Sequence, residues 1–230
     1  MSWVQDNIAR LRETLPKEVT LVCVSKFHPA ELIRQAYDAG ERDFGESRVQ
    51  ELLEKHKTLP ADIRWHFIGH LQTNKVRQIV PFVSLIHGVD SLHLLEEINK
   101  EALKIGRIVP VLLEVHVAQE ETKFGFSPDE ALSFLRDGAW RPLAGVRLAG
   151  IMCMASNVDD EAQIRREFHL AATTFAAMRD ILAADTTLPR PDIEAFRHIS
   201  MGMSHDWHIA VKEGATLVRI GTTIFGERQY

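Results

Sequence analysis

The sequence predicts one α/β domain, residues 1–230, built as a closed (β/α)8 TIM barrel. Eight short β-rich runs alternate with longer segments of helical period, and this alternation predicts a parallel sheet. No strand-like run is left over and no Pro-, Gly- or Ser-rich linker divides the chain, which favours closure into a barrel over an open doubly wound sheet. The length of 230 residues is near the lower end of the range for complete barrels.

The predicted strands are short apolar or β-branched runs at residues 20–25, 42–45, 65–69, 83–89, 110–117, 146–152, 196–201 and 216–220. Predicted helices cover 29–39, 47–56, 74–80, 92–105, 128–136, 160–184 and 204–213, and an amphipathic helix at the N-terminus carries Val4, Ile8, Leu11 and Leu15. The segment 185–194, with two prolines, is predicted to be a loop at one rim. In such a barrel the active site lies at the C-terminal ends of the strands.

Composition and charge narrow the classes of function. A net charge of −5 gives no broad attraction for nucleic acid or anionic membrane, so neither is an expected partner. Cys23 and Cys153 lie in predicted strands and are expected to be buried thiols rather than a disulfide. The N-terminus is not a signal peptide and no apolar run reaches membrane-spanning length, so a cytoplasmic protein is expected.

Lys26 ends the first predicted strand, in the run VSKFHP. Period-two alternation puts it on the same face as Val22 and Val24, at the C-terminal mouth of the barrel. An interior position disfavours the ammonium, and the uncharged amine is the form that attacks a carbonyl to give an imine. The alternative is a lysine that extends to the rim or pairs with a carboxylate.

Arg219 lies in the last predicted strand, TLVRIGTTIFG, on the same face as Leu217. In a closed barrel this strand lies beside the first, so Arg219 is expected next to Lys26. A buried guanidinium keeps its proton, disfavours a second charge nearby and can donate to a ring nitrogen or an anion. The alternative is an ion pair with an inward carboxylate such as Glu46 or Glu114.

A phosphate site is predicted where SMGMSHD, residues 200–206, leads into a helix expected near Ser204. A glycine turn before a helix N-terminus leaves backbone N–H groups open to an anion, and Gly221 with Thr222 supplies a second set after the last strand. Phosphate sites recur at this place in barrels. The alternative is that Ser204 is only an N-cap and Gly202 only a turn residue.

Histidines elsewhere do not predict a metal site. His66 and His70, in WHFIGHLQTNK, are too far apart on a strand for one zinc ion, and no Cys or acidic residue completes a ligand set. His205 and His208 are three residues apart on a predicted helix and are expected to cap it and to lie on its surface.

Six motifs in order make the chain similar, nearly end to end, to the YggS/PROSC family of pyridoxal-phosphate-binding proteins. They are VSKFHP, DFGESRVQE at 43–51, WHFIGHLQTNK, EETKFGF at 120–126, SMGMSHD and RIGTTIFG. The resemblance implies a barrel like the N-terminal domain of alanine racemase (fold type III), with pyridoxal 5'-phosphate (PLP) held as a Schiff base on Lys26 and Arg219 facing the pyridine nitrogen. The residues predicted to bind the cofactor are Lys26, Ser200, Met201, Gly202, Met203, Ser204, Arg219, Gly221 and Thr222. No catalytic residue and no metal site are predicted.

An arginine at the pyridine nitrogen keeps that nitrogen unprotonated and disfavours carbanion chemistry. The resemblance therefore implies a regulator or carrier in vitamin B6 homeostasis, with transient contact with PLP-dependent apo-enzymes. Ser47 and His116 stand where the family commonly has asparagine, so their contacts, like those of Glu46 at the same mouth, are not assigned.

Two other functions stay open. An amino-acid racemase would need a second base on the opposite ring face, and none is evident. The β-domain that completes alanine racemase and supplies its tyrosine is missing, Tyr230 is a poor substitute, and a monomer is expected. A cofactor-free Schiff-base aldolase would use the same lysine and phosphate site.

Overall fold

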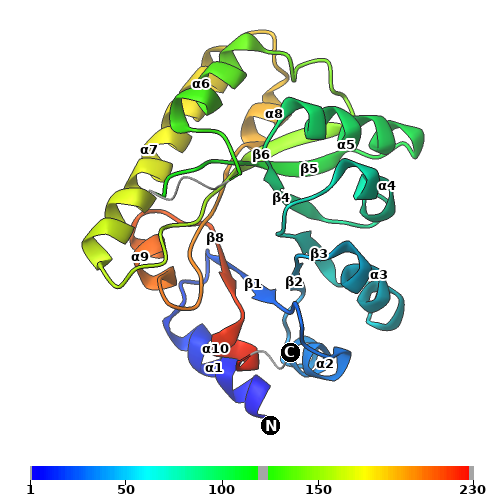
Figure 1. The fold of residues 1–230 in the computed structure, drawn as a ribbon, viewed down its shortest axis with the longest axis vertical. Coiled ribbons are helices and arrows are strands. Elements are labelled where there is room, and N and C mark those ends of the chain that lie inside the picture. Colours follow the sequence, from blue (N-terminus) through cyan, green and yellow to red (C-terminus); the bar gives the residue numbers. More distant parts are fainter. Residues whose placement is uncertain (1, 119–123, 228–230) are drawn as a thin grey trace.

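A computed structural model of the chain describes residues 2–118 and 124–227. Its centre is a closed barrel of eight parallel strands that follow one another in chain order. Helices between successive strands form the outer layer (Figure 1). The predicted (β/α)8 barrel is confirmed.

The strands differ from the predicted runs only at their ends. They are β1 (Thr20–Val24), β2 (Asp43–Glu46), β3 (Arg64–Phe67), β4 (Leu85–Val89), β5 (Val109–Glu114), β6 (Val146–Met152), β7 (His198–Ser200) and β8 (Leu217–Ile220). The barrel closes where β8 pairs with β1, with Val22 opposite Arg219.

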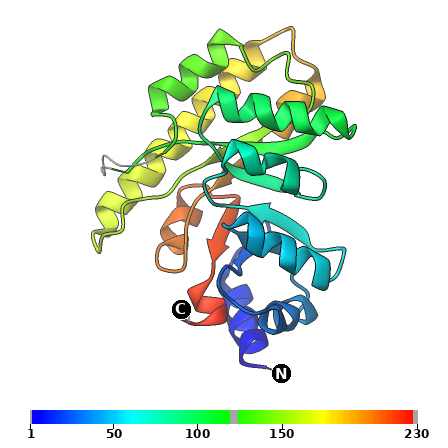
Figure 2. The same ribbon diagram turned by 45° about the vertical axis from the view of Figure 1, so that its right-hand side comes forward.

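The helices cover the outside of this sheet. They are α1 (Trp3–Thr14), α2 (Ala30–Asp38), α3 (Val49–Thr58), α4 (Val76–Ile79), α5 (Leu92–Lys104), α6 (Pro128–Asp137), α7 (Glu161–Ala184), α8 (Arg190–Ala195), α9 (Trp207–Lys212) and α10 (Thr222–Phe225), with a 3-10 turn, η1 (Thr73–Lys75), before α4. The N-terminal α1 lies beside α10 in both ribbon views, and Asn7 donates to the carbonyl of Ile224 (Figures 1 and 2).

Period-two alternation on the strands separates two apolar layers. On β1, Leu21 and Cys23 belong to the large layer between strands and helices, whereas Val22 belongs to a small cluster inside the barrel. The inner cluster contains Val22, Leu85, Leu112, Ala149, Met152 and Leu217. Cys23 and Cys153 are free and buried, as predicted.

Two predictions about local structure were wrong. Helix α8 occupies the second half of the segment predicted as a loop, because Pro191 lies in its first turn, where proline costs no hydrogen bond. Helix α9 begins at Trp207 rather than near Ser204, because the chain makes a turn through 204–206 first. Over the described ranges, no helix combines the length and the hydropathy that crossing a bilayer requires.

Candidate functional site

A cavity of about 240 Å³ lies at the C-terminal mouth of the barrel. Its walls come from the ends of β1, β3, β6 and β8 and from the turn after β7, which is where barrels of this kind carry their sites. The lining residues are Val24, Lys26, His28, Ile68, Met154, Met203, Ser204, His205, Arg219, Gly221 and Thr222.

Six of the nine predicted cofactor-binding residues line this cavity: Lys26, Met203, Ser204, Arg219, Gly221 and Thr222. The other three lie outside its lining. Ser200 is fully buried beneath Arg219, Met201 is fully buried in the outer apolar layer, and Gly202 shapes the turn through its backbone.

Lys26 reaches the cavity from the end of β1 because alternation carries it inward with Val22 and Val24. The next residue, Phe27, has φ of 66°, the left-handed region that side chains with a Cβ avoid. Its N–H donates to Glu51 Oε1 at 2.6 Å, and the guanidinium of Arg48 lies 4.6 Å from the centre of its ring. Both contacts hold the turn that presents Lys26.

A buried ionic cluster fixes the same turn from behind. Lys55 Nζ lies 2.8 Å from Glu46 Oε1, 2.6 Å from Glu51 Oε1 and 2.8 Å from the carbonyl oxygen of Ser25. Burial raises the pKa of Glu46 to about 7, against the opposing effect of Lys55 and Ser25. Glu46 therefore supports the loop from the α3 side and does not face the barrel interior.

Arg219 is held by neutral groups. Its Nη1 donates to the carbonyl and the hydroxyl of Ser200, at 2.8 and 2.7 Å, and its Nη2 donates to the carbonyl of Cys153 at 2.9 Å. Burial lowers its pKa from the ordinary value. Within residues 2–118 and 124–227 it makes no ion pair with Glu46 or Glu114, so that alternative was wrong.

The turns after β7 and β8 meet at Ser204. Its hydroxyl accepts from the backbone N–H of Gly221 at 3.3 Å and of Thr223 at 3.5 Å, so it joins the two turns instead of capping α9. In the part of the chain that the structure describes, the N–H groups of Ser204 and Thr222 find no protein acceptor. They are the donors that the arrangement offers to an anion.

Glycine is required where these turns pack. Gly202 has φ of 93°, and a Cβ there would lie 2.7 Å from Cβ of Ala210. A Cβ on Gly221 would approach the carbonyl oxygen of Val24 to 3.0 Å. Gly221 thus lets the end of β8 lie against β1, which brings Arg219 and Lys26 to one cavity.

Five lining residues were not predicted as cofactor neighbours: Val24, His28, Ile68, Met154 and His205. All of them except Met154 belong to motifs that the sequence singles out, so motif membership combined with strand ends could have found them. The ring of His28 packs against that of Phe225 in a tilted arrangement, with ring centres 5.2 Å apart. Met154 follows β6 and carries no motif signal.

The two histidines of the segment 65–75 point to different places. His66 faces the barrel interior, whereas His70 stacks on Phe124 at 4.2 Å and lies 3.2 Å from Asp90. Ser47 lies against Gly69 and His116 donates its backbone N–H to Phe126, and neither lines the cavity. Residues 120–123 of the motif EETKFGF, and Tyr230, lie outside the described residues.

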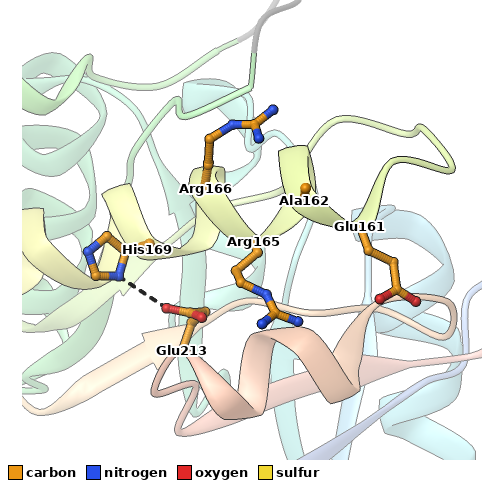
Figure 3. A pocket seen from close by; sticks show the side chains of 6 residues that line it. All are labelled: Glu161, Ala162, Arg165, Arg166, His169 and Glu213. Atoms are coloured by element: carbon orange, nitrogen blue, oxygen red, sulfur yellow. Dashed lines mark hydrogen bonds and ion pairs between the residues drawn. The ribbon is translucent and has the colours of Figure 1, made fainter.

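A larger concavity, about 650 Å³, lies on the outer surface between α7 and α9 (Figure 3). Arg165 extends from α7 toward α9, Arg166 points away, and His169 Nδ1 lies 3.1 Å from Glu213 Oε2. Its lining residues are Glu161, Ala162, Arg165, Arg166, His169 and Glu213. None of these is a lysine, so imine chemistry points to the smaller cavity at the mouth.

Comparison with known proteins supports the same assignment of the fold. The model of the family described as alanine racemase, N-terminal domain, matches residues 2–229. The pyridoxal phosphate homeostasis protein of Aquifex aeolicus is 40% identical over 211 residues, which cover 91% of this chain and 87% of that protein. The human pyridoxal phosphate homeostasis protein is 36% identical over 239 residues, covering 99% and 83%.

Solved structures agree. PipY of Synechococcus elongatus, in the structure with PLP bound, superposes with a TM-score of 0.84 at 36% identity, covering 97% of this chain and 100% of that one. Alanine racemase of Clostridium difficile shares the fold, with a TM-score of 0.72 at 16% identity, and this chain covers 56% of it. The chain therefore belongs to the alanine racemase N-terminal domain family, and within it to the group of pyridoxal phosphate homeostasis proteins.

Proposed function

We propose that the chain binds PLP in the mouth cavity through Lys26 and takes part in the homeostasis of this cofactor. The observation that carries the proposal is that one cavity collects an amine, a guanidinium and two open backbone N–H groups. These donors suit the aldehyde, the ring nitrogen and the phosphate of PLP. The structure of PipY with PLP bound, in a relative 36% identical, supports it.

Each lining group has one task. The amine of Lys26 would hold the aldehyde group of PLP covalently, with loss of one water. The N–H groups of Ser204 and Thr222 bind the phosphate at the joined turns. Arg219 donates to the ring nitrogen.

A carrier fits this site better than an enzyme does. Bound PLP supplies an electron sink, and a donor at the ring nitrogen keeps that nitrogen unprotonated and weakens the sink. On this proposal the protein is non-catalytic and passes PLP to apo-enzymes by transient contact. We propose that it does so as a monomer in the cytoplasm. Transfer to an apo-enzyme faster than PLP dissociates from the carrier alone would support this role, and equal rates would contradict it.

A racemase-like activity is the second candidate, and one observation favours it. His28 and His205 line the cavity, and imidazole groups can move protons at a substrate carbon. Incubation with L-alanine in D2O separates the two functions. A carrier exchanges the α-hydrogen no faster than the Lys26→Ala variant does.

Borohydride reduction tests the binding proposal directly. The purified protein is loaded with PLP, its visible absorbance is recorded, and the reduced product is mapped by peptide mass. We expect a pyridoxyl group on Lys26, its loss in Lys26→Ala, and its retention in the surface control Lys104→Ala. A colourless protein that takes up no added PLP contradicts the proposal and favours the cofactor-free aldolase.

A further inference from the structure

A line of hydrogen bonds crosses the barrel interior from Arg219 to Asp43. Arg219 Nη1 lies 2.7 Å from Ser200 Oγ, which lies 2.9 Å from His87 Nδ1. His87 Nε2 lies 2.9 Å from His66 Nδ1, and His66 Nε2 lies 3.0 Å from Asp43 Oδ1. His87 and Ser200 are fully buried. The line joins β8, β7, β4, β3 and β2.

The two ends of this line have fixed hydrogen-bonding roles. Arg219 can only donate, and an ionised carboxylate can only accept. Burial would raise the pKa of Asp43, but hydrogen bonds from Arg64 and His66 prevail and lower it to about 2. One hydrogen on each imidazole satisfies every contact when Ser200 donates to His87, His87 to His66 and His66 to Asp43.

Neutral imidazole is also the form that the surroundings of His87 favour. Burial is the main cause that lowers its pKa well below the ordinary value. With Nε2 carrying the hydrogen, its Nδ1 is free to accept. The hydroxyl proton of Ser200 is thereby directed toward His87, and the oxygen of Ser200 presents a lone pair to Arg219.

This arrangement fixes the guanidinium. An arginine has five N–H donors, and three hydrogen bonds tie Arg219 to Ser200 and Cys153. Two N–H groups are left for a group in the cavity that Arg219 lines. If Ser200 lost its acceptor, its hydroxyl would rotate and one of the three restraints would weaken.

We propose that His87 is a positioning residue of the cofactor site: through Ser200 it holds Arg219 in the orientation that faces the ring of bound PLP. This inference rests on the proposed function. His87 lies outside the cavity lining, so it acts on the cofactor only through Ser200 and Arg219.

The test compares replacements that keep different halves of the histidine. In His87→Asn the amide oxygen can stand near the place of Nδ1 and accept from Ser200, whereas in His87→Gln the amide can reach only the His66 side. His87→Phe removes both contacts. Leu112→Ala, a fully buried change in the apolar part of the barrel interior, is the packing control.

The readouts are PLP affinity, the visible circular dichroism of bound PLP, and thermal unfolding of the apo-protein. We expect His87→Phe and His87→Gln to weaken PLP binding about tenfold and change the dichroism band, an effect of the size of one lost hydrogen bond to a charged group. We expect His87→Asn to stay within about threefold of wild type. Leu112→Ala lowers apo stability and leaves the band unchanged.

A double variant keeps the inference falsifiable if His87→Phe is unstable. Ser200→Ala combined with His87→Gln should bind PLP no more weakly than Ser200→Ala alone, because His87 acts through Ser200. Losses that add, or a His87→Gln protein with unchanged affinity and dichroism, overturn the inference. If wild type itself binds no PLP, the proposed function fails instead.

Discussion

The backbone N–H of Phe27, the residue directly after Lys26, donates a 2.6 Å hydrogen bond to the carboxylate of Glu51. Glu51 is in turn held by Lys55. A side chain of α3 therefore sets the backbone of the residue that follows Lys26, and the ionic cluster behind β2 belongs to the site although none of it lines the cavity.

Replacing Glu51 with alanine should loosen the turn. We expect a loss of about 1–3 kcal/mol in the free energy of unfolding, because a buried lysine and a backbone N–H both lose an acceptor, together with weaker PLP binding. Urea unfolding of the apo-protein and PLP titration check this. Glu54→Ala, on the exposed side of the same helix, is the control, and equal effects of the two changes would show that the contact to Phe27 is unimportant.

The left-handed backbone of Phe27 gives a second prediction. Phe27→Ala and Phe27→Gly both remove the ring beneath Arg48, but only glycine adopts φ of 66° without a Cβ penalty. We expect Phe27→Gly to be more stable than Phe27→Ala by about 1 kcal/mol. A chemical denaturation series on both variants measures the difference, and a more stable alanine variant would contradict it.

Two glycines with similar φ should respond differently to alanine. Gly202, at 93°, would place a Cβ 2.7 Å from Cβ of Ala210, whereas a Cβ on Gly214, at 98°, meets nothing within 4 Å. Gly214→Ala carries only the backbone penalty of about 1–2 kcal/mol. Gly202→Ala should cost clearly more and weaken PLP binding, since the turn that carries Ser204 must shift. Comparable melting temperatures for the two variants would refute the packing argument.

Glu46 predicts a pH dependence of stability. Its pKa is raised from the ordinary value of 4.5 to about 7, so folding takes up a proton between these values. Its favourable contribution is complete below about pH 4.5 and is lost as pH rises through about 7. Relative to Glu46→Gln, wild type should lose up to about 3 kcal/mol between pH 4.5 and 8.

Thermal unfolding of wild type and Glu46→Gln across that pH range measures the effect. Glu96→Gln, on the exposed side of α5, is the control and should show no comparable change in slope. A constant difference between wild type and Glu46→Gln over the range would mean that the buried carboxylate does not titrate there.

The alternation of side chains along a strand and the adjacency of β1 and β8 were enough to predict that Lys26 and Arg219 lie at one cavity. Period-two alternation, continued past the end of β1, turns Lys26 toward the barrel interior, and closure places β8 beside β1, so the sequence alone predicts Arg219 at the same cavity. The same rules place the glycine turns after β7 and β8 at this cavity, and we propose their open N–H groups as the anion donors. These are local rules combined with one topological fact.

The supports of the site could not be predicted in this way. Ser200 was assigned to the phosphate because it lies in a motif, yet its hydroxyl pairs with His87, 113 residues away in the chain. No local sequence pattern indicates the contact between Ser200 and His87. None indicates that Glu46 would face α3 and Lys55 either. Such pairings depend on the stagger of neighbouring strands and on which helix covers each strand, and composition carries neither.

The interior of this barrel is half apolar and half polar, with Val22, Leu112 and Leu217 in one part and the line from Ser200 to Asp43 in the other. An apolar residue introduced alone into the polar part leaves donors or acceptors on both of its sides without a partner. This destabilises the fold even when the volume of the new side chain fits. Exchange of the whole line for packed hydrocarbon would avoid that cost but needs several simultaneous changes. Amino-acid replacement should therefore be slower in the polar part of the interior than in the apolar part. Replacements in the polar part should occur together at several of its positions.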